Sequence, residues 1–197
     1  AAIRGGARFY AGYPITPSSE IMEYLSWRMN EVGGAFVQAE SELAGINMVI
    51  GASSCGVRAL TASSGPGISL KQEGISTLCD EGLPAVVITQ VRYGNGLGTL
   101  FTSQCDYHRE TRGGGQGDYR CIVLCPSSIQ EFVDLMLPAY ELAEKYRIVT
   151  IMMGEGTLGQ MMEPVELPDF VEPKNTLGFK WPLHIQEDRY LRKRFYG

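Results

Sequence analysis

The segment PAVVITQV, residues 84–91, gives the clearest structural signal in this chain. β-Branched residues dominate it, and the first charge after it is Arg92. A dense apolar run of this length is typical of a central strand in a parallel sheet, where both faces are covered. The segment before it, residues 66–82, has the pattern of a helix that stops at Gly-Leu-Pro. A helix therefore leads directly into a buried strand.

The same alternation extends outward in both directions. Helical patterns carry apolar residues at helical spacing, as in Leu43, Ile46 and Val49. Repeated strand–helix alternation predicts an α/β fold: a doubly wound, mainly parallel sheet with helices on both faces. Pro138 is expected to kink or break the last long helix. The predicted strands are 7–12, 34–40, 58–63, 84–91, 121–126 and 147–153, and the predicted helices are 17–32, 41–56, 66–82 and 127–146.

The pattern changes at Pro164, where the sequence becomes proline-rich and aperiodic. We therefore predict an α/β domain over residues 1–163, followed by a linker or arm over 164–197 that leads to a further domain or a partner subunit. The charged segment 186–197 is expected to form a short helix. Because the chain does not begin with Met, its native start is expected to lie upstream.

Composition excludes several classes of function. The net charge is −5 and no basic stripe precedes the last dozen residues, which argues against nucleic acid as a partner. The longest apolar runs are only a few residues, so no membrane span is predicted. The five cysteines are odd in number and form no CxxC pair. This favours reduced, buried thiols in a cytoplasmic protein, with no metal or iron–sulfur ligands on this chain.

Polar loops follow three of the predicted strands. In GYPITPSSE, residues 12–20, Thr16 fits a helix N-cap with Pro17 at the first helical position. In AESE, residues 39–42, Glu40 and Glu42 stand at the start of a helix, where acidic side chains suit the helix dipole. On the residues alone, these helix-start roles are favoured, although a carboxylate at a strand end could also contact a ligand.

Two further loops leave structural and functional interpretations open. TASSGPG, residues 61–67, is either a tight turn capped by Ser64 or Gly65, or a place where the backbone approaches a ligand. Arg92 ends the central strand, and a salt bridge is about as probable there as a grip on a substrate carboxylate. His108, beside Asp106 and Arg109, is expected to be polar and exposed. The chain lacks a P-loop, an opening GxGxxG motif and a GxSxG motif.

Together, the loops carry a family resemblance. GYPITPSSE, VQAESELAGINMVIGAS, TASSGPGISLKQEGIS, GGGQGDYRCIVLCPSSIQE and GTLGQMMEPVE resemble the alpha subunit of 2-oxoacid:ferredoxin oxidoreductases. The likeness is greatest to the 2-oxoisovalerate type and runs from about residue 1 to about 168. The resemblance implies the pyrimidine domain of a thiamine diphosphate-binding fold. It also implies oxidative decarboxylation of a branched-chain 2-oxoacid to an acyl-CoA, with reduction of ferredoxin.

The resemblance also assigns roles to residues. Glu42 matches the family's catalytic glutamate, whose protonated carboxyl would bond ring nitrogen N1′ of the cofactor and favour its imino tautomer. Burial would support that protonated form. Thr16 and Arg92 match substrate-binding residues, the arginine gripping the substrate carboxylate. The cofactor contacts are expected from Pro14, Thr16, Glu42, Ser64 and Gly65.

The absence of a GDG motif in this chain fits a site shared between subunits. The resemblance implies a beta subunit carrying the diphosphate and Mg²⁺ domain, gamma and ferredoxin-like delta subunits with iron–sulfur clusters, and coenzyme A as acyl acceptor. The family's RGGPGLG loop is RYGNGLG here, residues 92–98, so Tyr93 replaces a glycine. The alternatives are the same chemistry on 2-oxoglutarate, pyruvate or an aryl pyruvate, or a non-catalytic module that docks to other subunits.

Overall fold

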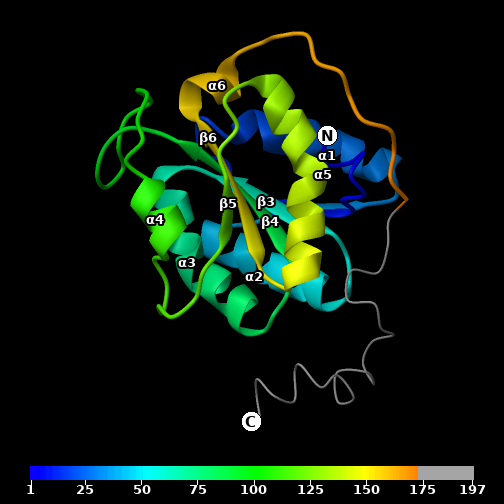
Figure 1. Cartoon of the computed structure of the whole chain (residues 1–197), viewed down its shortest axis with the longest axis horizontal. Helices are drawn as coiled ribbons and strands as arrows, with labels where there is room; N and C mark the ends of the chain where they lie inside the picture. The colour runs from blue at the N-terminus through cyan, green and yellow to red at the C-terminus, as the bar shows by residue number, and fades with distance from the viewer. Residues whose placement is uncertain (173–197) are drawn as a thin grey trace.

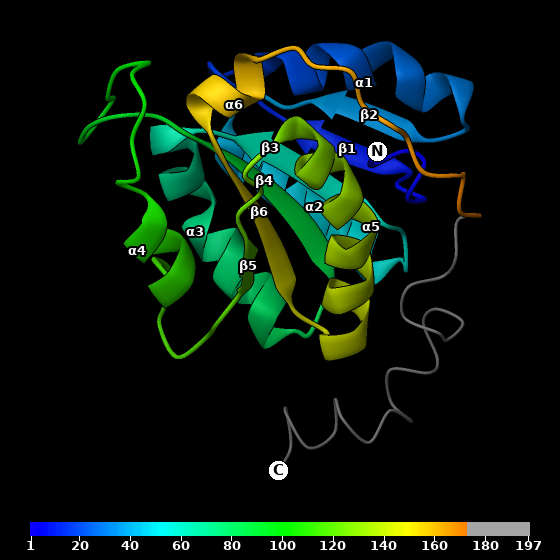
Figure 2. The same ribbon diagram turned by 45° about the horizontal axis from the view of Figure 1, so that its top comes forward.

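Six parallel strands form one sheet in the order β2-β1-β3-β4-β6-β5, with helices packed around it (Figures 1 and 2). The computed structural model describes residues 1–172 of the chain. The strands are β1 (Phe9–Gly12), β2 (Ala35–Gln38), β3 (Ala59–Ser63), β4 (Ala85–Val91), β5 (Ile122–Leu124) and β6 (Val149–Glu155). The helices are α1 (Ser19–Glu31), α2 (Glu42–Ser54), α3 (Gly65–Asp80), α4 (Tyr107–Arg112), α5 (Ile129–Tyr146) and α6 (Gly156–Gln160).

The predicted central strand is confirmed. All seven residues of β4 are buried, and β4 pairs with β3 on one side and β6 on the other. One apolar cluster packs α2 and α3 against one face of the sheet, through residues such as Ile46, Ile68 and Leu78. A second cluster packs α1 and α5 against the other face, through residues such as Leu25 and Tyr140. The doubly wound α/β fold predicted from the sequence is thus the one observed (Figure 2).

Two details differ from the sequence-based expectations. Pro138 does not break α5, which runs through it as one helix of 18 residues, because its buried face (Met136, Ala139 and Tyr140) packs on the sheet. The predicted buried thiols are only partly found. Cys79 is buried, whereas Cys55, Cys105 and Cys125 are exposed. The strand-like run 121–126 holds only a short edge strand, β5, so Cys125 lies beyond its end.

The segment after α6 forms no helix or strand up to residue 172 and lies against the N-terminal turn. The Arg4 guanidinium donates to the carbonyl of Pro168 at 2.7 Å, and Val171 N–H donates to the carbonyl of Arg4 at 2.7 Å. The charged segment 186–197, predicted to be helical, lies outside the described residues. Within residues 1–172, no helix is long and apolar enough to cross a membrane.

Candidate functional site

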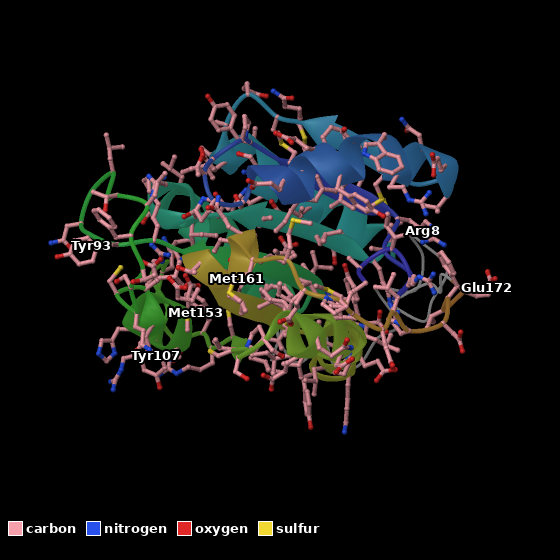
Figure 3. All side chains as sticks on the ribbon, turned by 90° about the horizontal axis from the view of Figure 1, so that it is seen from above. Arg8, Tyr93, Tyr107, Met153, Met161 and Glu172 are labelled. Carbon is pink, nitrogen blue, oxygen red and sulfur yellow. The ribbon has the colours of Figure 1, made fainter. Side chains whose placement is uncertain are left out.

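Because all six strands are parallel, the loops that follow their carboxyl ends gather at one edge of the sheet. Tyr93 and Tyr107, from the loop after β4, lie at that end of the molecule, and Arg8, just before β1, lies at the opposite end (Figure 3). The loops singled out in the sequence all belong to the carboxyl edge. The structure can therefore test which of their side chains meet.

The loop between β1 and α1 is not built as the sequence predicted. Thr16 is not the N-cap of α1: the helix begins at Ser19, with Ser18 in the cap position and without a side-chain cap bond. The reason is a turn in which both Ser18 N–H and Ser18 Oγ donate to the carbonyl of Ile15, at 2.9 and 2.8 Å. Pro17 is buried and follows a cis peptide bond. Thr16 and Pro14 are exposed.

Glu42 is the first residue of α2 and only 6% exposed. The N-cap of α2 is Ser41, whose Oγ accepts a hydrogen bond from Ala44 N–H at 3.2 Å, so Ser41 and not Glu42 caps the helix. The Glu42 carboxylate reaches across to the first turn of α3. A Cβ placed on Gly67 would stand 2.7 Å from Glu42 Oε1 and 2.1 Å from Ser63 Oγ. Glu42, Ser63 and Gly67 therefore share one small volume.

The Gly-Pro-Gly bend forms the start of α3 itself. Ser64, one of the two caps that the sequence left open, occupies the N-cap position, but its buried hydroxyl makes no cap bond. Gly65 has a φ of +45°, a conformation that glycine adopts without steric cost. A Cβ at Gly65 would lie 2.8 Å from Nε of Arg92. The bend thus brings two glycines against two charged side chains, Glu42 and Arg92.

Arg92 ties two of these loops together. Its Nη1 donates to the carbonyl of Thr16 at 2.9 Å, and its Nη2 donates to the carbonyl of Leu97. Its Nε is buried without a hydrogen-bond partner among the described residues. The salt bridge left open by the sequence is not found in residues 1–172.

The predicted residues thus meet around the first turn of α3, with one exception. Pro14 lies in the same loop as Thr16, but no hydrogen bond joins it to the others within the described residues. Three buried polar atoms of the group have no partner in residues 1–172: Ser63 Oγ, Ser64 Oγ and Arg92 Nε. Buried polar groups are normally paired, so three unpartnered polar atoms in one group call for an explanation. The strand-end cluster, as we name it, consists of Thr16, Glu42, Ser63, Ser64, Gly65, Gly67 and Arg92.

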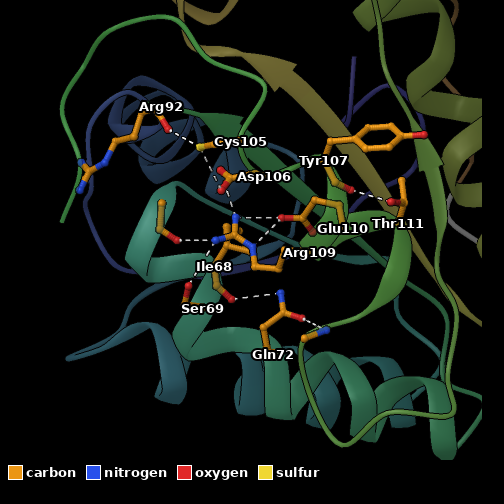
Figure 4. Close-up of polar contacts among 12 residues, drawn as sticks. Ile68, Ser69, Gln72, Arg92, Cys105, Asp106, Tyr107, Arg109, Glu110 and Thr111 are labelled. Carbon is orange, nitrogen blue, oxygen red and sulfur yellow. Dashed lines mark hydrogen bonds and ion pairs between the residues drawn. The ribbon is translucent and has the colours of Figure 1, made fainter. Parts of the chain in front are cut away.

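A short helix supporting this cluster was missed in the sequence. α4 lies in the glycine-rich loop 92–120, where six residues give no usable periodicity. Arg109 Nη1 donates to the carbonyl of Gly65 at 3.1 Å and to Ser69 Oγ at 3.2 Å (Figure 4). Arg109 Nη2 also pairs with Glu110 Oε1 at 2.9 Å and Asp106 Oδ2 at 3.1 Å. The i,i+3 spacing of Asp106 and Arg109 was the available signal.

The expectation that the polar side chains around His108 are exposed is only partly confirmed. His108 is exposed as predicted, but Asp106 is buried and Arg109 is partly buried. Glu110 is buried too, and burial raises its pKa while the Arg109 guanidinium opposes that shift. The Arg109 guanidinium offsets the two buried acids beside it, and its hydrogen bonds to Gly65 and Ser69 hold α4 against α3. Within residues 1–172, no group of three or more His, Cys, Asp or Glu side chains is placed to hold a metal ion.

Lys71 was also missed, because a lysine in a helical pattern is normally exposed. It is fully buried on α3, and its Nζ donates to the backbone carbonyl of Glu42 at 3.2 Å. Burial lowers the pKa of Lys71 to about 8, and the charge of Glu42 opposes that shift. Two buried charged residues, Glu42 and Lys71, therefore lie next to each other beside the strand-end cluster.

Comparison with known proteins places the chain in a family. Residues 1–191 match the family model described as "Pyruvate flavodoxin/ferredoxin oxidoreductase, thiamine diP-bdg". Ketoisovalerate oxidoreductase subunit VorB of Methanothermobacter marburgensis is 53% identical over 168 residues, which are 85% of this chain and 48% of VorB. 2-Oxoglutarate synthase subunit KorA of Methanocaldococcus jannaschii is 45% identical over 172 residues, which are 87% of this chain and 47% of KorA.

A solved structure shows the same fold. The 2-oxoglutarate:ferredoxin oxidoreductase from Magnetococcus marinus, with 2-oxoglutarate, coenzyme A and succinyl-CoA bound, superimposes with a TM-score of 0.79 and 26% identity, covering 98% of this chain and 41% of that chain. The chain spans about half the length of the curated relatives it matches. The family resemblance found in the loop motifs is confirmed, and the chain belongs to the thiamine diphosphate-binding family of the pyruvate flavodoxin/ferredoxin oxidoreductases.

Proposed function

We propose that this chain supplies the pyrimidine-binding half of a thiamine diphosphate site in a 2-oxoacid:ferredoxin oxidoreductase. The whole enzyme would convert a branched-chain 2-oxoacid to its acyl-CoA and reduce ferredoxin. The observation that carries the proposal is the strand-end cluster, in which the Glu42 carboxylate lies against Gly67 among buried, unpartnered hydroxyls. The 53% identity to a ketoisovalerate oxidoreductase subunit supports the branched-chain substrate.

The cluster fits an aminopyrimidine. Such a ring has polar atoms on its edge and flat apolar faces, so it needs hydrogen-bond partners and close backbone approach. Glu42 offers a carboxylate at a helix start, and Ser63 and Ser64 offer hydroxyls that no described residue uses. Gly65 and Gly67 leave the first turn of α3 without Cβ atoms. Bound thiamine diphosphate supplies a nucleophilic carbon for the oxoacid carbonyl, and Glu42 provides the proton contact at ring nitrogen N1′.

We propose Thr16 and Arg92 as substrate contacts, with Pro14 limiting the backbone freedom of their loop. Two backbone carbonyls fix the Arg92 guanidinium through one N–H of Nη1 and one of Nη2, so the Nε–H and one further N–H on each Nη are left for a ligand anion. A guanidinium held in this way is suited to a carboxylate, because its planar donors match two oxygens. The hydrogen bond from Arg92 to the Thr16 carbonyl joins the two loops, so the Thr16 hydroxyl and the Arg92 guanidinium could contact the same substrate.

Partner subunits would supply the remaining functions of the enzyme. We propose that a partner subunit carries the diphosphate and Mg²⁺ half of the site, that further subunits hold iron–sulfur clusters, and that the complex is cytoplasmic. The relatives are named as subunits, which supports a multi-subunit assembly. The division into a domain over 1–163 and an arm over 164–197 belongs to the same proposal.

One observation supports a docking role in addition. The loop after β4 presents apolar side chains to solvent: Leu97 is 77% exposed and Phe101 is 74% exposed, and Tyr93 is also exposed. Apolar side chains grouped in this way are typical of a protein interface. If docking were the only role, the complex would form without binding thiamine diphosphate.

Reconstitution with partner subunits tests the proposal. The complex would be assayed for bound thiamine diphosphate, acyl-CoA formation and ferredoxin reduction, with 2-oxoisovalerate, 2-oxoglutarate, pyruvate and phenylpyruvate as substrates. We expect the highest kcat/KM with 2-oxoisovalerate. A preference for another oxoacid would overturn the substrate assignment alone, whereas assembly without cofactor or turnover would favour the docking module.

A further inference from the structure

Arg109 is a partly buried charge whose hydrogen bonds connect two helices beside the strand-end cluster. Its side chain is 19% exposed and lies between Ser69 of α3 and Glu110 of α4 (Figure 4). On the α3 side, Nη1 donates to the carbonyl of Gly65 at 3.1 Å and to Ser69 Oγ at 3.2 Å. On the α4 side, Nε and Nη2 donate to Glu110 Oε1 at 3.0 and 2.9 Å. All three nitrogens of the guanidinium are therefore engaged.

The acids on α4 explain the charge of Arg109 but not its contact with α3. Asp106 and Glu110 are buried, and a guanidinium that only compensated them could stay within its own helix. The bond to the Gly65 carbonyl joins positions 44 residues apart in the chain. A hydrogen bond from an ionised donor is about twice as strong as a neutral one, so this contact can hold the carbonyl in place.

The turn that accepts this bond is built from residues with little stiffness of their own. Gly65 and Gly67 flank Pro66, and Gly65 has a φ of +45°. Within the turn, Gly67 N–H donates to the carbonyl of Ser64 at 2.9 Å. Glycine has the greatest backbone freedom of any residue, so such a turn needs contacts from other elements to fix its position. Arg109 provides one from α4.

The same turn faces both charged side chains of the proposed site. A Cβ at Gly65 would lie 2.8 Å from Arg92 Nε, and a Cβ at Gly67 would lie 2.7 Å from Glu42 Oε1. A shift of the turn would therefore change its spacing to Arg92 and to Glu42 at once. Arg109 is placed to prevent such a shift.

We propose that Arg109 is a positioning residue: through the Gly65 carbonyl it fixes the first turn of α3, against which the aminopyrimidine ring of thiamine diphosphate binds. This inference rests on the proposed function, because it assumes that the ring occupies the strand-end cluster. Since its nitrogens are engaged by α3 and α4, Arg109 acts through the turn and not on the ring. Its loss should weaken the binding of the ring in particular.

The test compares two ligands in the reconstituted complex with Mg²⁺. One is thiamine diphosphate, and the other is the diphosphate of its thiazole half, which lacks the pyrimidine. The ratio of the thiazole Kd to the thiamine Kd isolates the pyrimidine, because the other contacts are common to both ligands. It is measured for the wild type, Arg109→Met, Arg109→Lys and Glu42→Ala. As matched controls, Ser69→Ala removes the other α3 acceptor of Arg109, and Arg112→Met removes an exposed positive charge from the same helix.

We expect the ratio to fall about tenfold in Arg109→Met, within the range of coupling between contacting residues, and to stay unchanged in both controls. Arg109→Lys keeps a charge beside the acids of α4, but one ammonium cannot reproduce a fork that also reaches Gly65, so the ratio should fall there too. An unchanged ratio in either Arg109 variant, with a lowered one in Glu42→Ala, shows that Arg109 only stabilises α4, and only this inference fails. If Glu42→Ala leaves the ratio unchanged, the ring does not bind at the cluster and the proposed function fails with it.

A second measurement needs no variant. Coupling between two sites is reciprocal, so binding of the pyrimidine should in turn steady α4. In the wild-type complex, the backbone amides of residues 107–112 should exchange hydrogen several-fold more slowly with thiamine diphosphate bound than with the thiazole diphosphate bound. The amides of α5, on the other face of the sheet, serve as the internal reference. Equal exchange of residues 107–112 with both ligands would overturn the inference, whatever the stability of the variants.

Discussion

The replacement Gly67→Ala tests the geometry of the strand-end cluster most sharply. Gly67 lies in the first turn of α3, and its φ is not positive, so alanine fits its backbone. Space is the difficulty. The new Cβ would stand 2.1 Å from Ser63 Oγ, about 1.3 Å short of the 3.4 Å at which ordinary van der Waals contact begins, and 2.7 Å from Glu42 Oε1.

The magnitude follows from two opposing terms. Overpacking of a rigid site costs about 1–3 kcal/mol, and replacing glycine by alanine in a helix returns about 1 kcal/mol. The net loss of unfolding free energy is therefore about 0–2 kcal/mol. The functional effect should be larger, because Glu42 Oε1 is about 0.7 Å too close to the new Cβ, and a displacement of about 1 Å can lower a rate about 100-fold.

Gly51→Ala is the matched control. Gly51 lies in α2, is exposed, and has nothing within 4 Å of its Cβ position. Urea unfolding, the Kd for thiamine diphosphate and the turnover rate of the reconstituted complex would be measured for both variants. Gly51→Ala should gain about 0.5–1 kcal/mol of stability and keep its activity. If Gly67→Ala binds cofactor and turns over as well as Gly51→Ala, Glu42 does not work from the position observed.

Three further predictions concern charged residues. Arg92→Ala should raise KM for the oxoacid about 10- to 100-fold with a smaller change in kcat, since hydrogen bonds to charged groups contribute about 1.5–3 kcal/mol; steady-state kinetics would show an unchanged KM if Arg92 does not bind the carboxylate. Arg58→Ala removes the buried partner of Glu144, whose Oε2 lies 2.9 Å from Arg58 Nη2, and should lower the free energy of unfolding in urea by about 3–5 kcal/mol. The affinity for the cofactor should not change, because Arg58 precedes the amino end of β3, opposite the strand-end cluster. Relative to Lys71→Met, the free energy of unfolding of the wild type should rise by about 3 kcal/mol between about pH 8 and pH 10.5. The reason is that Lys71 keeps its proton up to about pH 10.5 in the unfolded chain, whereas the buried amine of the folded protein releases it near pH 8. Equal pH dependence of the two proteins in unfolding experiments would show that Lys71 is not buried as a charge.

The fold could be predicted because its signals are local. The β-branched run 84–91 and the alternating strand and helix patterns fix a parallel sheet, and the structure follows them to within a few residues. Parallel strands then bring Glu42 and Arg92 to one edge without further information. Thr16 was misassigned as a cap because a Thr-Pro helix start and a turn closed by Ser18 have similar local sequences.

The missed residues depend on contacts far apart in the sequence. Lys71 is identified only when α2 packs on α3 and Gly45 leaves room for its ammonium. Arg109 is identified only when α4 folds back onto Gly65, 44 residues earlier in the chain. Both residues are charged in segments that local rules would place in solvent, and both are ordered by tertiary contacts with the first turns of α2 and α3.

The contact proposed between Glu42 and the pyrimidine ring of a shared cofactor predicts a specific loss of turnover when the Glu42 carboxyl is replaced. The rate of 2-oxoisovalerate-dependent ferredoxin reduction would be compared among the wild-type complex, Glu42→Gln and Glu40→Gln. Glu40 is exposed and two residues away, so it controls for the loss of a nearby charge. We predict a fall of about 100-fold or more for Glu42→Gln, in the range of lost acid–base catalysis, and no change for Glu40→Gln. A Glu42→Gln complex that turns over at the wild-type rate would show that Glu42 does not act on the cofactor.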